Sequence, residues 1–384
     1  MKRAWGLVTV LAATATASYL CRVNVSVAGA LMMRDLGWSQ AEMGRVFSAF
    51  LLGYALCQIP AGMLADRFGP RRVFAVAAMA WVTATVSIAA AGTFFLGLLL
   101  ARFLLGVAEA PTFPAAAQAI ARWLPAHQHG RANGIVIAAI GLGSALAPPL
   151  VSSVMVRAGW RWSLLASAVP ALLVGLVWLA VRTPPGGRVP SGMRGAIPTT
   201  PGFALLTLSY TLQGYVGYIF VFWFYLYLVD VRHFDLLRGA VLSSLPWLLS
   251  IVSIPAGGWL FDRLGRTRRV VPIVGLAGAG LMTAAGAYTR DAYQAAACLA
   301  LATALVLSVE GSFWATMTEF AGPHSGAAGG AMNMGSNIGG MISPALTPVI
   351  AASLGWDRAL LVSAGIAVTA AVLWIWIRPP IRAT

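Results

Sequence analysis

The chain has 384 residues, of which 59% are hydrophobic and only 10% are charged. So few charged side chains cannot cover a soluble globule of this size, and a soluble protein is therefore excluded. The formal charge of +15 comes from basic residues that lie between apolar runs, so their position argues for membrane topology and against a nucleic-acid partner.

Apolar runs of about 20 residues recur along the chain, and each can cross a hydrocarbon layer of roughly 30 Å as a helix. Backbone groups in lipid must be satisfied within the segment, and no alternating barrel pattern is present, so the spans are expected to be helical. The predicted spans are 5–31, 43–64, 73–91, 94–118, 131–155, 161–181, 203–229, 238–260, 270–288, 292–318, 326–352 and 358–377. We therefore expect an all-α membrane protein with twelve transmembrane helices.

The longest interruption, from Arg182 to Thr200, is rich in Pro and Gly and has no helical pattern. We interpret it as a linker between two halves. The predicted organisation is an N-terminal six-helix half (1–181), a cytoplasmic linker (182–200) and a C-terminal six-helix half (201–384).

Basic residues are distributed unequally between the two sides that these spans define. Most lie on the side of the chain ends and the linker, for example Arg71, Arg72, Arg268 and Arg269. Because cytoplasmic loops carry an excess of Lys and Arg, we expect a multi-pass protein of the plasma (inner) membrane with both termini in the cytoplasm. The first 17 residues look like a signal peptide, but their removal would leave an odd number of spans, so we expect them to be retained.

An internal repeat supports the division into halves. A shift of about 196 positions superimposes Gly62, Asp66, Arg67, Gly69 and Gly159 on Gly258, Asp262, Arg263, Gly265 and Gly355. A slightly different shift brings Glu109 near Glu310, so that each half has an acidic residue within the membrane. In duplicated transporters the substrate lies between the halves near the middle of the membrane, and rocking opens the site to each side in turn.

The stretch Gly62-Met-Leu-Ala-Asp66-Arg67-Phe-Gly69-Pro-Arg71-Arg72 resembles the loop signature between the second and third helices of the major facilitator superfamily. Four further stretches resemble its anion:cation symporter family, which includes sialin and the vesicular glutamate, hexuronate, galactonate and glucarate transporters. They are Tyr19 to Ala28, Arg102 to Pro114, Gly159 to Trp162 and Asn333 to Gly340. The resemblance implies the major facilitator fold and secondary active import of an organic anion, with proton symport as the driving force.

In one respect the sequence departs from that family. Bacterial sugar-acid importers commonly have an acidic residue just before the arginine of the first helix, and here that position is Cys21. The departure puts their proton stoichiometry in doubt for this chain.

Two charged residues within predicted spans are the leading candidates for chemistry, Arg22 and Glu109. A guanidinium near the middle of the bilayer costs about 3 kcal/mol or more unless it faces a wet cavity or a partner. Its planar fork matches a carboxylate, and the resemblance implies that Arg22 binds the substrate. Glu109 is expected to carry protons, because a carboxyl in low dielectric can load and unload them near neutral pH. If the two residues are partners, a substrate anion that competes for Arg22 favours protonation of Glu109 and couples both movements.

Structural alternatives exist for these residues. Arg22 can be paired permanently to hold the bundle together, and Glu109 can pair with Arg102, two turns earlier on the same helix. Arg102 matches the fourth-helix arginine of the superfamily, so the resemblance implies gating or proton transfer. Glu310 has no intramembrane arginine in its own half, and we expect it to stay protonated, to carry a second proton or to bind substrate hydroxyls.

Neutral polar side chains complete the expected site. Tyr54 and Gln58 lie one helical turn apart, as do Asn333 and Asn337, so each pair shares a helix face. Such groups suit hydroxyl or carboxylate ligands, although interhelical hydrogen bonds and aromatic belts use the same residues. The expected substrate-binding residues are Arg22, Asn24, Tyr54, Gln58, Gln213, Tyr215, Tyr218, Asn333 and Asn337, and the expected proton-coupling residues are Glu109, Glu310 and Arg102.

The loop signature has an expected gating role. Asp and Arg can form a charge-assisted latch that must break when the halves move. The alternative is a basic loop that only sets topology. The expected gating residues are Gly62, Asp66, Arg67, Gly69, Arg71, Arg72, Asp262 and Arg263.

An enzyme is not expected, because the four histidines lie in loops or at span ends and no nucleophile, nucleotide-binding or zinc-binding motif is present. The expected partners are a small organic anion, protons or sodium, and membrane lipid, with no cofactor, metal or nucleic acid, and we expect a monomer. The main alternative is a proton-antiport exporter of drugs or metabolites. Against it, the fifth span reads Gly141-Leu-Gly143-Ser-Ala-Leu-Ala-Pro148-Pro149 and lacks the Gly-Pro followed by Gly-Gly usual in antiporters.

Overall fold

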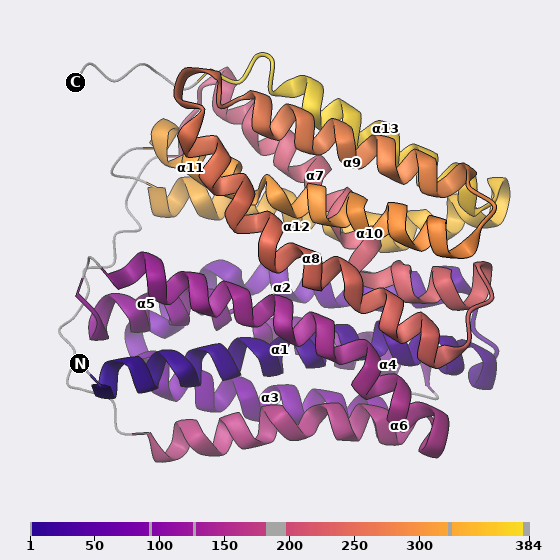
Figure 1. Cartoon of the computed structure of the whole chain (residues 1–384). Helices are drawn as coiled ribbons and strands as arrows, with labels where there is room; N and C mark the ends of the chain where they lie inside the picture. The colour runs from indigo at the N-terminus through magenta and orange to yellow at the C-terminus, as the bar shows by residue number, and fades with distance from the viewer. Residues whose placement is uncertain (1, 92–93, 126–127, 182–196, 322–324, 379–384) are drawn as a thin grey trace. The chain divides into compact units, whose positions relative to one another are not determined.

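The computed structural model describes the chain except for residues 1, 92–93, 126–127, 182–196, 322–324 and 379–384, together with the side chains of 2–4, 59, 62, 66, 91, 121, 129–130, 266 and 325–327. Helices make up nearly all of the described chain, and no strand occurs in it (Figure 1). Most of the predicted linker, 182–196, lies outside the described residues.

The chain divides into two compact units. The first contains α1 and α3–α6 with most of α2, and the second contains α7 and α9–α13 with most of α8. The helices of the first are α1 (Lys2–Leu36), α2 (Gln40–Phe68), α3 (Pro70–Ala91), α4 (Phe95–Glu109), α5 (Thr112–Trp123) and α6 (His129–Ala180). Those of the second are α7 (Pro201–Leu226), a π-helical turn (Tyr227–Val231), α8 (Leu236–Arg263), a 3₁₀ turn (Gly265–Thr267), α9 (Val270–Tyr288), α10 (Ala292–Ser308), α11 (Glu310–Ala321), α12 (Ser325–Leu354) and α13 (Trp356–Leu373).

The prediction of twelve transmembrane helices is confirmed. Ten helical stretches of the described chain are long and apolar enough to cross a membrane. One of them, Arg131–Ala180, is divided in two at Gly159, where φ is 83° and ψ is 171°. The 29-residue α2 adds the remaining span. Within the first unit α6 packs along α1 and α3, and within the second α12 packs along α7 and α13 along α9.

Two spans that we predicted as continuous are interrupted. α4 ends at Glu109 and α5 begins at Thr112, whereas α10 ends at Ser308 and α11 begins at Glu310. Pro111 explains the first interruption, because proline has no N–H to donate to the helix. Each interruption places an acidic residue at a helix end, a feature that hydropathy alone does not detect.

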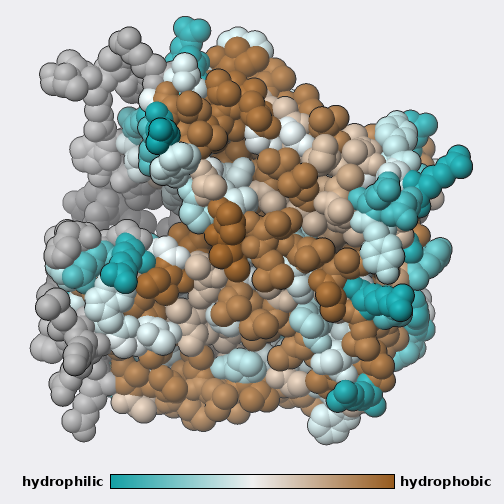
Figure 2. Space-filling model, in the orientation of Figure 1, coloured by the Kyte–Doolittle hydropathy of each residue, from teal (hydrophilic) through white to brown (hydrophobic). Residues whose placement is uncertain are grey.

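Helix α4 exposes apolar side chains and buries charged ones, which is the reverse of a helix in a soluble protein. Leu96, Leu100 and Leu104 are spaced by four residues and are 64%, 57% and 50% exposed, whereas Arg102 and Glu109 are fully buried. Residues four apart share one helix face, so this face is apolar and the opposite face carries the charges. Figure 2 shows the same sorting, with apolar side chains over most of the visible face and hydrophilic ones along its edges. An exposed apolar surface of this extent is the surface expected to face lipid.

Backbone geometry repeats between the halves at the predicted offset. Gly69 and Gly265 both have positive φ (78° and 47°), and so do Gly159 and Gly355 (83° and 89°). Each pair is separated by 196 positions. Glycine adopts positive φ without the steric cost of a Cβ atom, so these positions end one helix and redirect the chain in both halves.

Candidate functional site

Among the buried polar side chains of the described residues, three carry a charge: Arg22 on α1, and Arg102 and Glu109 on α4. Their exposed fractions are 2%, 0% and 0%. Charged groups within membrane helices are costly, and they usually pair with one another or mark the path of a substrate or ion. The three residues, all in the first unit, are therefore the leading candidates for a functional site.

Arg22 and Glu109 form a buried ion pair. The Nη2 atom of Arg22 lies 2.8 Å from Oε2 of Glu109, and its Nε donates a hydrogen bond of 3.0 Å to the same oxygen. Both contacts reach one carboxylate oxygen, so the pair lacks the parallel two-oxygen geometry of the strongest Arg–carboxylate pairs. A carboxylate that offers both of its oxygens would make the stronger pair with this guanidinium.

Three aromatic rings surround the Arg22 guanidinium. Its central carbon lies 4.4 Å from the centroid of the Tyr19 ring, 5.0 Å from that of Phe50 and 4.8 Å from that of Tyr54. Arg22 Nη1 also donates a hydrogen bond of 3.1 Å to the Tyr19 hydroxyl. Cation–π contacts stabilise a guanidinium away from water, so the cage holds the cation in place while its carboxylate partner changes.

Arg102 also contacts Phe50, but it has fewer contacts than Arg22. Its central guanidinium carbon is 4.9 Å from the Phe50 ring centroid, and its Nη2 is 3.4 Å from the backbone oxygen of Arg22. The Nε and Nη1 atoms of Arg102 are buried without a hydrogen-bond partner. Phe50 thus contacts both guanidinium groups, while Glu109 is paired with only one of them.

A close helix crossing positions the α4 residues. A Cβ atom on Gly106 would overlap the backbone oxygen of Phe50 on α2. Glycine at this position lets the two helices approach until Phe50 and Tyr54 reach the guanidinium groups. Glu109 follows three residues later at the last position of α4.

The remaining residues predicted for the first half lie elsewhere. Asn24 is fully buried and donates a hydrogen bond of 2.8 Å to the Ser167 hydroxyl of α6, so it connects α1 to α6. Two residues along a helix point in different directions, and Asn24 accordingly does not join Arg22. Gln58 lies one turn beyond Tyr54 on α2 and is partly exposed.

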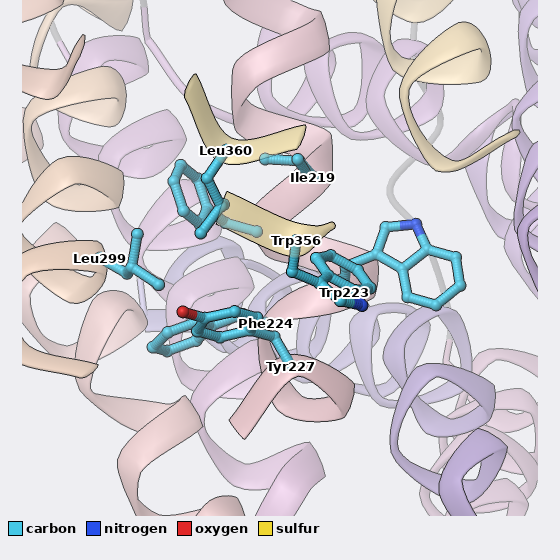
Figure 3. Close-up of a pocket in the computed structure, with 8 residues that line it drawn as sticks. Ile219, Trp223, Phe224, Tyr227, Leu299, Trp356 and Leu360 are labelled. Carbon is cyan, nitrogen blue, oxygen red and sulfur yellow. The ribbon is translucent and has the colours of Figure 1, made fainter. Parts of the chain in front are cut away.

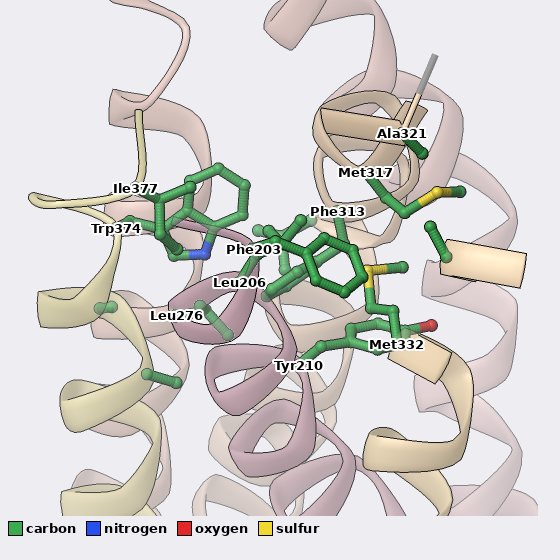
Figure 4. Close-up of a cluster of buried hydrophobic side chains, with 14 residues drawn as sticks. Phe203, Leu206, Tyr210, Leu276, Phe313, Met317, Ala321, Met332, Trp374 and Ile377 are labelled. Carbon is green, nitrogen blue, oxygen red and sulfur yellow. The ribbon is translucent and has the colours of Figure 1, made fainter. Parts of the chain in front are cut away.

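In the second unit, Glu310 is held by neutral donors. The Tyr210 hydroxyl, Gln213 Nε2 (3.3 Å) and Trp314 Nε1 (3.0 Å) all donate to its carboxylate. Tyr210 comes from the largely apolar cluster of buried side chains that Figure 4 shows, where it packs against Phe313. The acidic residues of the two halves therefore have different partners, a guanidinium for Glu109 and neutral hydrogen-bond donors for Glu310.

The other polar residues predicted for the second half link α7 to α12. The Tyr218 hydroxyl donates to Oδ1 of Asn337 (3.4 Å), and Asn337 Nδ2 donates to the backbone oxygen of Asn333 (2.9 Å). The Tyr215 hydroxyl lies 3.5 Å from that of Thr347. The structure thus places Gln213 with Glu310 and Tyr218 with Asn337, which in turn binds the backbone of Asn333.

Parts of the predicted gating motif bind helix ends within their own unit. Arg71 donates to the backbone oxygens of Trp178 and Leu179 at the end of α6. Arg269, which is not among the predicted gating residues, donates in a similar way to the backbone oxygen of Ile375 beyond α13. A cation at the carbonyl end of a helix stabilises that end. Arg67, Arg72, Asp262 and Arg263 are exposed, Gly69 has positive φ, and the side chains of Gly62 and Asp66 lie outside the described residues.

A small pocket near the end of α7 has the wrong chemistry for an anion. Its lining contains Ile219, Trp223, Phe224, Tyr227 and Trp356, which Figure 3 shows around the cavity, and no charged side chain. Trp223 contributes to this lining, and its indole N–H donates to the backbone oxygen of Pro344 (3.2 Å). We therefore place the candidate site at the charged residues.

Sequence reasoning missed several contacts of both acidic residues. Tyr19 and Phe50 were not among the predicted site residues, nor were Tyr210 and Trp314. Tyr19 lies three residues before Arg22, so helical spacing contained the signal for it. Phe50 and Tyr210 come from other helices and offered no such local signal.

Comparisons with known proteins agree with this architecture. A profile of the Major Facilitator Superfamily matches residues 11–333. The probable sulfoacetate transporter of Cupriavidus necator is 31% identical over 94% of this chain and 91% of its own length. The hexuronate transporter of Bacillus subtilis is 26% identical, and the D-galactonate transporter of Escherichia coli 28%; each match covers 94% of this chain and 92% of the relative.

The fold is also similar to that of a solved structure. A bacterial homologue of the human lysosomal transporter Spinster, in an inward-facing and occupied conformation, has a TM-score of 0.84 with 19% identity, over 97% of this chain and 96% of that one. At this level of identity the similarity concerns the fold alone. The superfamily and the curated relatives are transporters and not enzymes. With a profile match over most of its length and a relative above 30% identity, this integral, multi-pass membrane protein belongs to the major facilitator superfamily.

Proposed function

We propose that the protein is a secondary active transporter that moves a small organic anion together with protons by alternating access. The observation that carries the proposal is the buried Arg22–Glu109 pair within its aromatic cage. A buried guanidinium that is paired to a carboxylate through a single oxygen is a binding group that a stronger anionic ligand can take over.

Competition between the substrate and Glu109 for Arg22 couples substrate binding to proton binding. When a substrate carboxylate binds Arg22, Glu109 loses its cation, and an ionised carboxylate without a partner is costly in a buried site. Uptake of a proton from the water on the open side converts Glu109 to its neutral form and removes that cost. Substrate and proton thus bind cooperatively, as linkage requires.

The names of the relatives support the choice of substrate class. Sulfoacetate, hexuronate and galactonate are all small organic anions, and a guanidinium fork binds the acidic group that they share. Asn24, Tyr54, Gln58, Gln213, Tyr215, Tyr218, Asn333 and Asn337 remain proposed substrate contacts, and Arg102 and Glu310 remain proposed proton-coupling residues.

Movement between the two access states is assigned to the gating motif. Asp66 with the neighbouring arginines is proposed as the latch, and Asp262 with Arg263 as its counterpart in the second half. We further propose that the protein acts as a monomer in the plasma (inner) membrane, with both termini in the cytoplasm.

Uptake by proteoliposomes tests the function. The purified protein is reconstituted and offered labelled sulfoacetate, glucuronate, galactonate and glucarate, with and without an inwardly directed proton gradient and with sodium replaced by choline. We expect at least one anion to accumulate only under the proton gradient, with or without sodium. Arg22→Ala proteoliposomes provide the matched inactive control. The proposal fails if no anion accumulates, or if the parent and the variant behave alike.

A further inference from the structure

The buried charges of the first unit do not balance. In the described residues of that unit, the buried charged side chains are the cations Arg22 and Arg102 and the anion Glu109. Both guanidinium carbons lie about 5 Å from the ring of Phe50 (5.0 and 4.9 Å). With Glu109 ionised the cluster has one net positive charge, and with Glu109 protonated it has two.

Arg102 is the cation of this cluster that forms no ion pair within the described residues. It is fully buried, and although its Nη2 reaches the backbone oxygen of Arg22 (3.4 Å), its Nε and Nη1 atoms lack hydrogen-bond partners. A buried charge and its donors are normally paired, because leaving them unpaired forfeits their hydration without compensation. A buried guanidinium without an ion pair beside a proposed anion site therefore indicates that a ligand supplies the missing negative charge.

We propose that this cluster selects dianions and accepts a dianion together with the proton on Glu109. The inference rests on the proposed function and deepens it by naming the charge class of the substrate. When Glu109 is protonated, Arg22 and Arg102 are both left positive, and two negative charges are needed to neutralise them. One acidic group of the substrate engages the Arg22 fork, and the second balances the charge of Arg102. With a monoanion bound and Glu109 protonated, the cluster keeps one net positive charge, so a monoanion is expected to bind less tightly than a dianion.

Cys21 adds no negative charge to the cluster of Arg22, Arg102 and Glu109. It precedes Arg22 on α1, is fully buried, and its thiol donates to the backbone oxygen of Ser167 (3.7 Å). Glu109 and Arg102 lie close enough to act electrostatically on a charge at this position. A carboxylate at this position would supply the charge that Arg102 lacks, and the neutral thiol does not. Cys21 is thus a specificity-determining residue that acts through the charge of the cluster.

Other titratable groups near the cluster leave this count unchanged. Tyr19 and Tyr54 pack their rings against Arg22 and add neither a carboxylate nor a guanidinium to the cluster. Glu310, in the second unit, receives hydrogen bonds from Tyr210, Gln213 and Trp314 of that same unit. Within the second unit these neutral donors stabilise its carboxylate.

The first test compares ligands that differ only in charge. Binding of glucarate is compared with that of gluconate, and binding of sulfoacetate with that of isethionate, in which a hydroxymethyl group replaces the carboxylate. Affinities for the purified full-length protein are measured at pH 6 and constant ionic strength. We expect the dianion of at least one pair to bind at least tenfold more tightly than its monoanion. Equal affinities within both pairs, or tighter binding of the monoanions, would overturn the inference.

The second test changes the charge of the cluster. Cys21→Asp adds one carboxylate, and Cys21→Asn has similar size without the charge. We expect Cys21→Asp to reduce the dianion-to-monoanion affinity ratio at least tenfold, and Cys21→Asn to keep it within about twofold of the parent. An unchanged ratio in Cys21→Asp contradicts the assignment of Cys21. The parent comparison stands without the variants if Cys21→Asp does not fold.

The two proposals fail in different ways. If neither monoanions nor dianions bind, the proposed transport of organic anions is itself wrong. If both charge classes bind to the parent with equal affinity, anion transport stands and dianion selection fails.

Discussion

At the scale of single residues, Arg22 is held by more than its charge. Arg22 contacts Glu109 through two nitrogen atoms and contacts three aromatic rings through its guanidinium plane. A lysine ammonium keeps the charge, but it has neither the planar fork nor the flat face that stacks on rings. Charge alone therefore does not reproduce this site.

Arg22→Lys is expected to weaken binding of the transported anion at least tenfold, which corresponds to about 1.4 kcal/mol or more. Anion affinity is measured by titration calorimetry on purified protein. Arg290→Lys, at an exposed position, is the control and should bind like the parent. Normal affinity in a folded Arg22→Lys protein would remove Arg22 from the binding site.

Glu109→Gln is expected to uncouple the transporter. Glutamine resembles the protonated acid and leaves Arg22 free for the substrate, so exchange of labelled for unlabelled anion should persist. Accumulation driven by a proton gradient should fall at least tenfold in the same proteoliposomes. Continued accumulation would mean that the Arg22–Glu109 pair is only structural.

Glu310→Gln tests whether the second half contributes a proton. The carboxylate of Glu310 is stabilised by three neutral donors from its own unit. If Glu310 carries the second proton, the number of protons moved per anion falls by one in Glu310→Gln while substrate affinity stays within about threefold of the parent. This ratio is read from the reversal potential of transport at a fixed pH gradient, and an unchanged ratio removes Glu310 from the coupling.

At the scale of helices, glycine determines how closely α7 and α12 approach each other. A Cβ atom on Gly339 of α12 would overlap the backbone oxygen of Thr211 on α7, and one on Gly214 of α7 would overlap that of Ser336 on α12. Small residues allow helices in a membrane to pack backbone against backbone. This crossing positions Tyr218 beside Asn337. A change in the packing of α7 against α12 is therefore expected to alter the hydrogen bond between these two side chains.

Gly339→Ala is therefore expected to destabilise the protein, although alanine is the better helix former by about 1 kcal/mol. The clash with Thr211 forces α7 and α12 apart at a cost of about 1–3 kcal/mol, which should lower the midpoint of thermal unfolding by several degrees in detergent. The matched control is Gly330→Ala on the same helix, where a Cβ atom meets nothing within 4 Å. The control should be neutral or slightly stabilising, and equal behaviour of the two variants would contradict the packing argument.

At the scale of the whole molecule, charge asymmetry predicts orientation. The turn before α9 carries Arg268 and Arg269, whereas the turn after it carries Arg290 beside Asp291. The 19 residues of α9 span about 28 Å as a helix, so the two turns lie on opposite sides of the membrane. The positive-inside rule assigns the first of them to the cytoplasm.

Cysteine labelling in intact cells checks this orientation. In a background without the native cysteines, Thr267→Cys should react with a membrane-impermeant maleimide only after the cells are opened. Arg290→Cys should react from outside, and both positions are exposed. The reverse pattern would invert the assigned orientation.

The sequence by itself determined the membrane class, the twelve spans and the family, because hydropathy and repeated glycine and charge motifs are read along the chain. It also indicated Arg22 and Glu109, since a charge within an apolar run is visible without a structure. It could not show that Glu109 pairs with Arg22 of another helix and not with Arg102 of its own. Nor could it find Phe50, whose ring contacts both guanidinium groups, or the three donors to Glu310. Those contacts depend on how closely helices cross, which glycine positions and the break at Pro111 permit but which only tertiary packing decides.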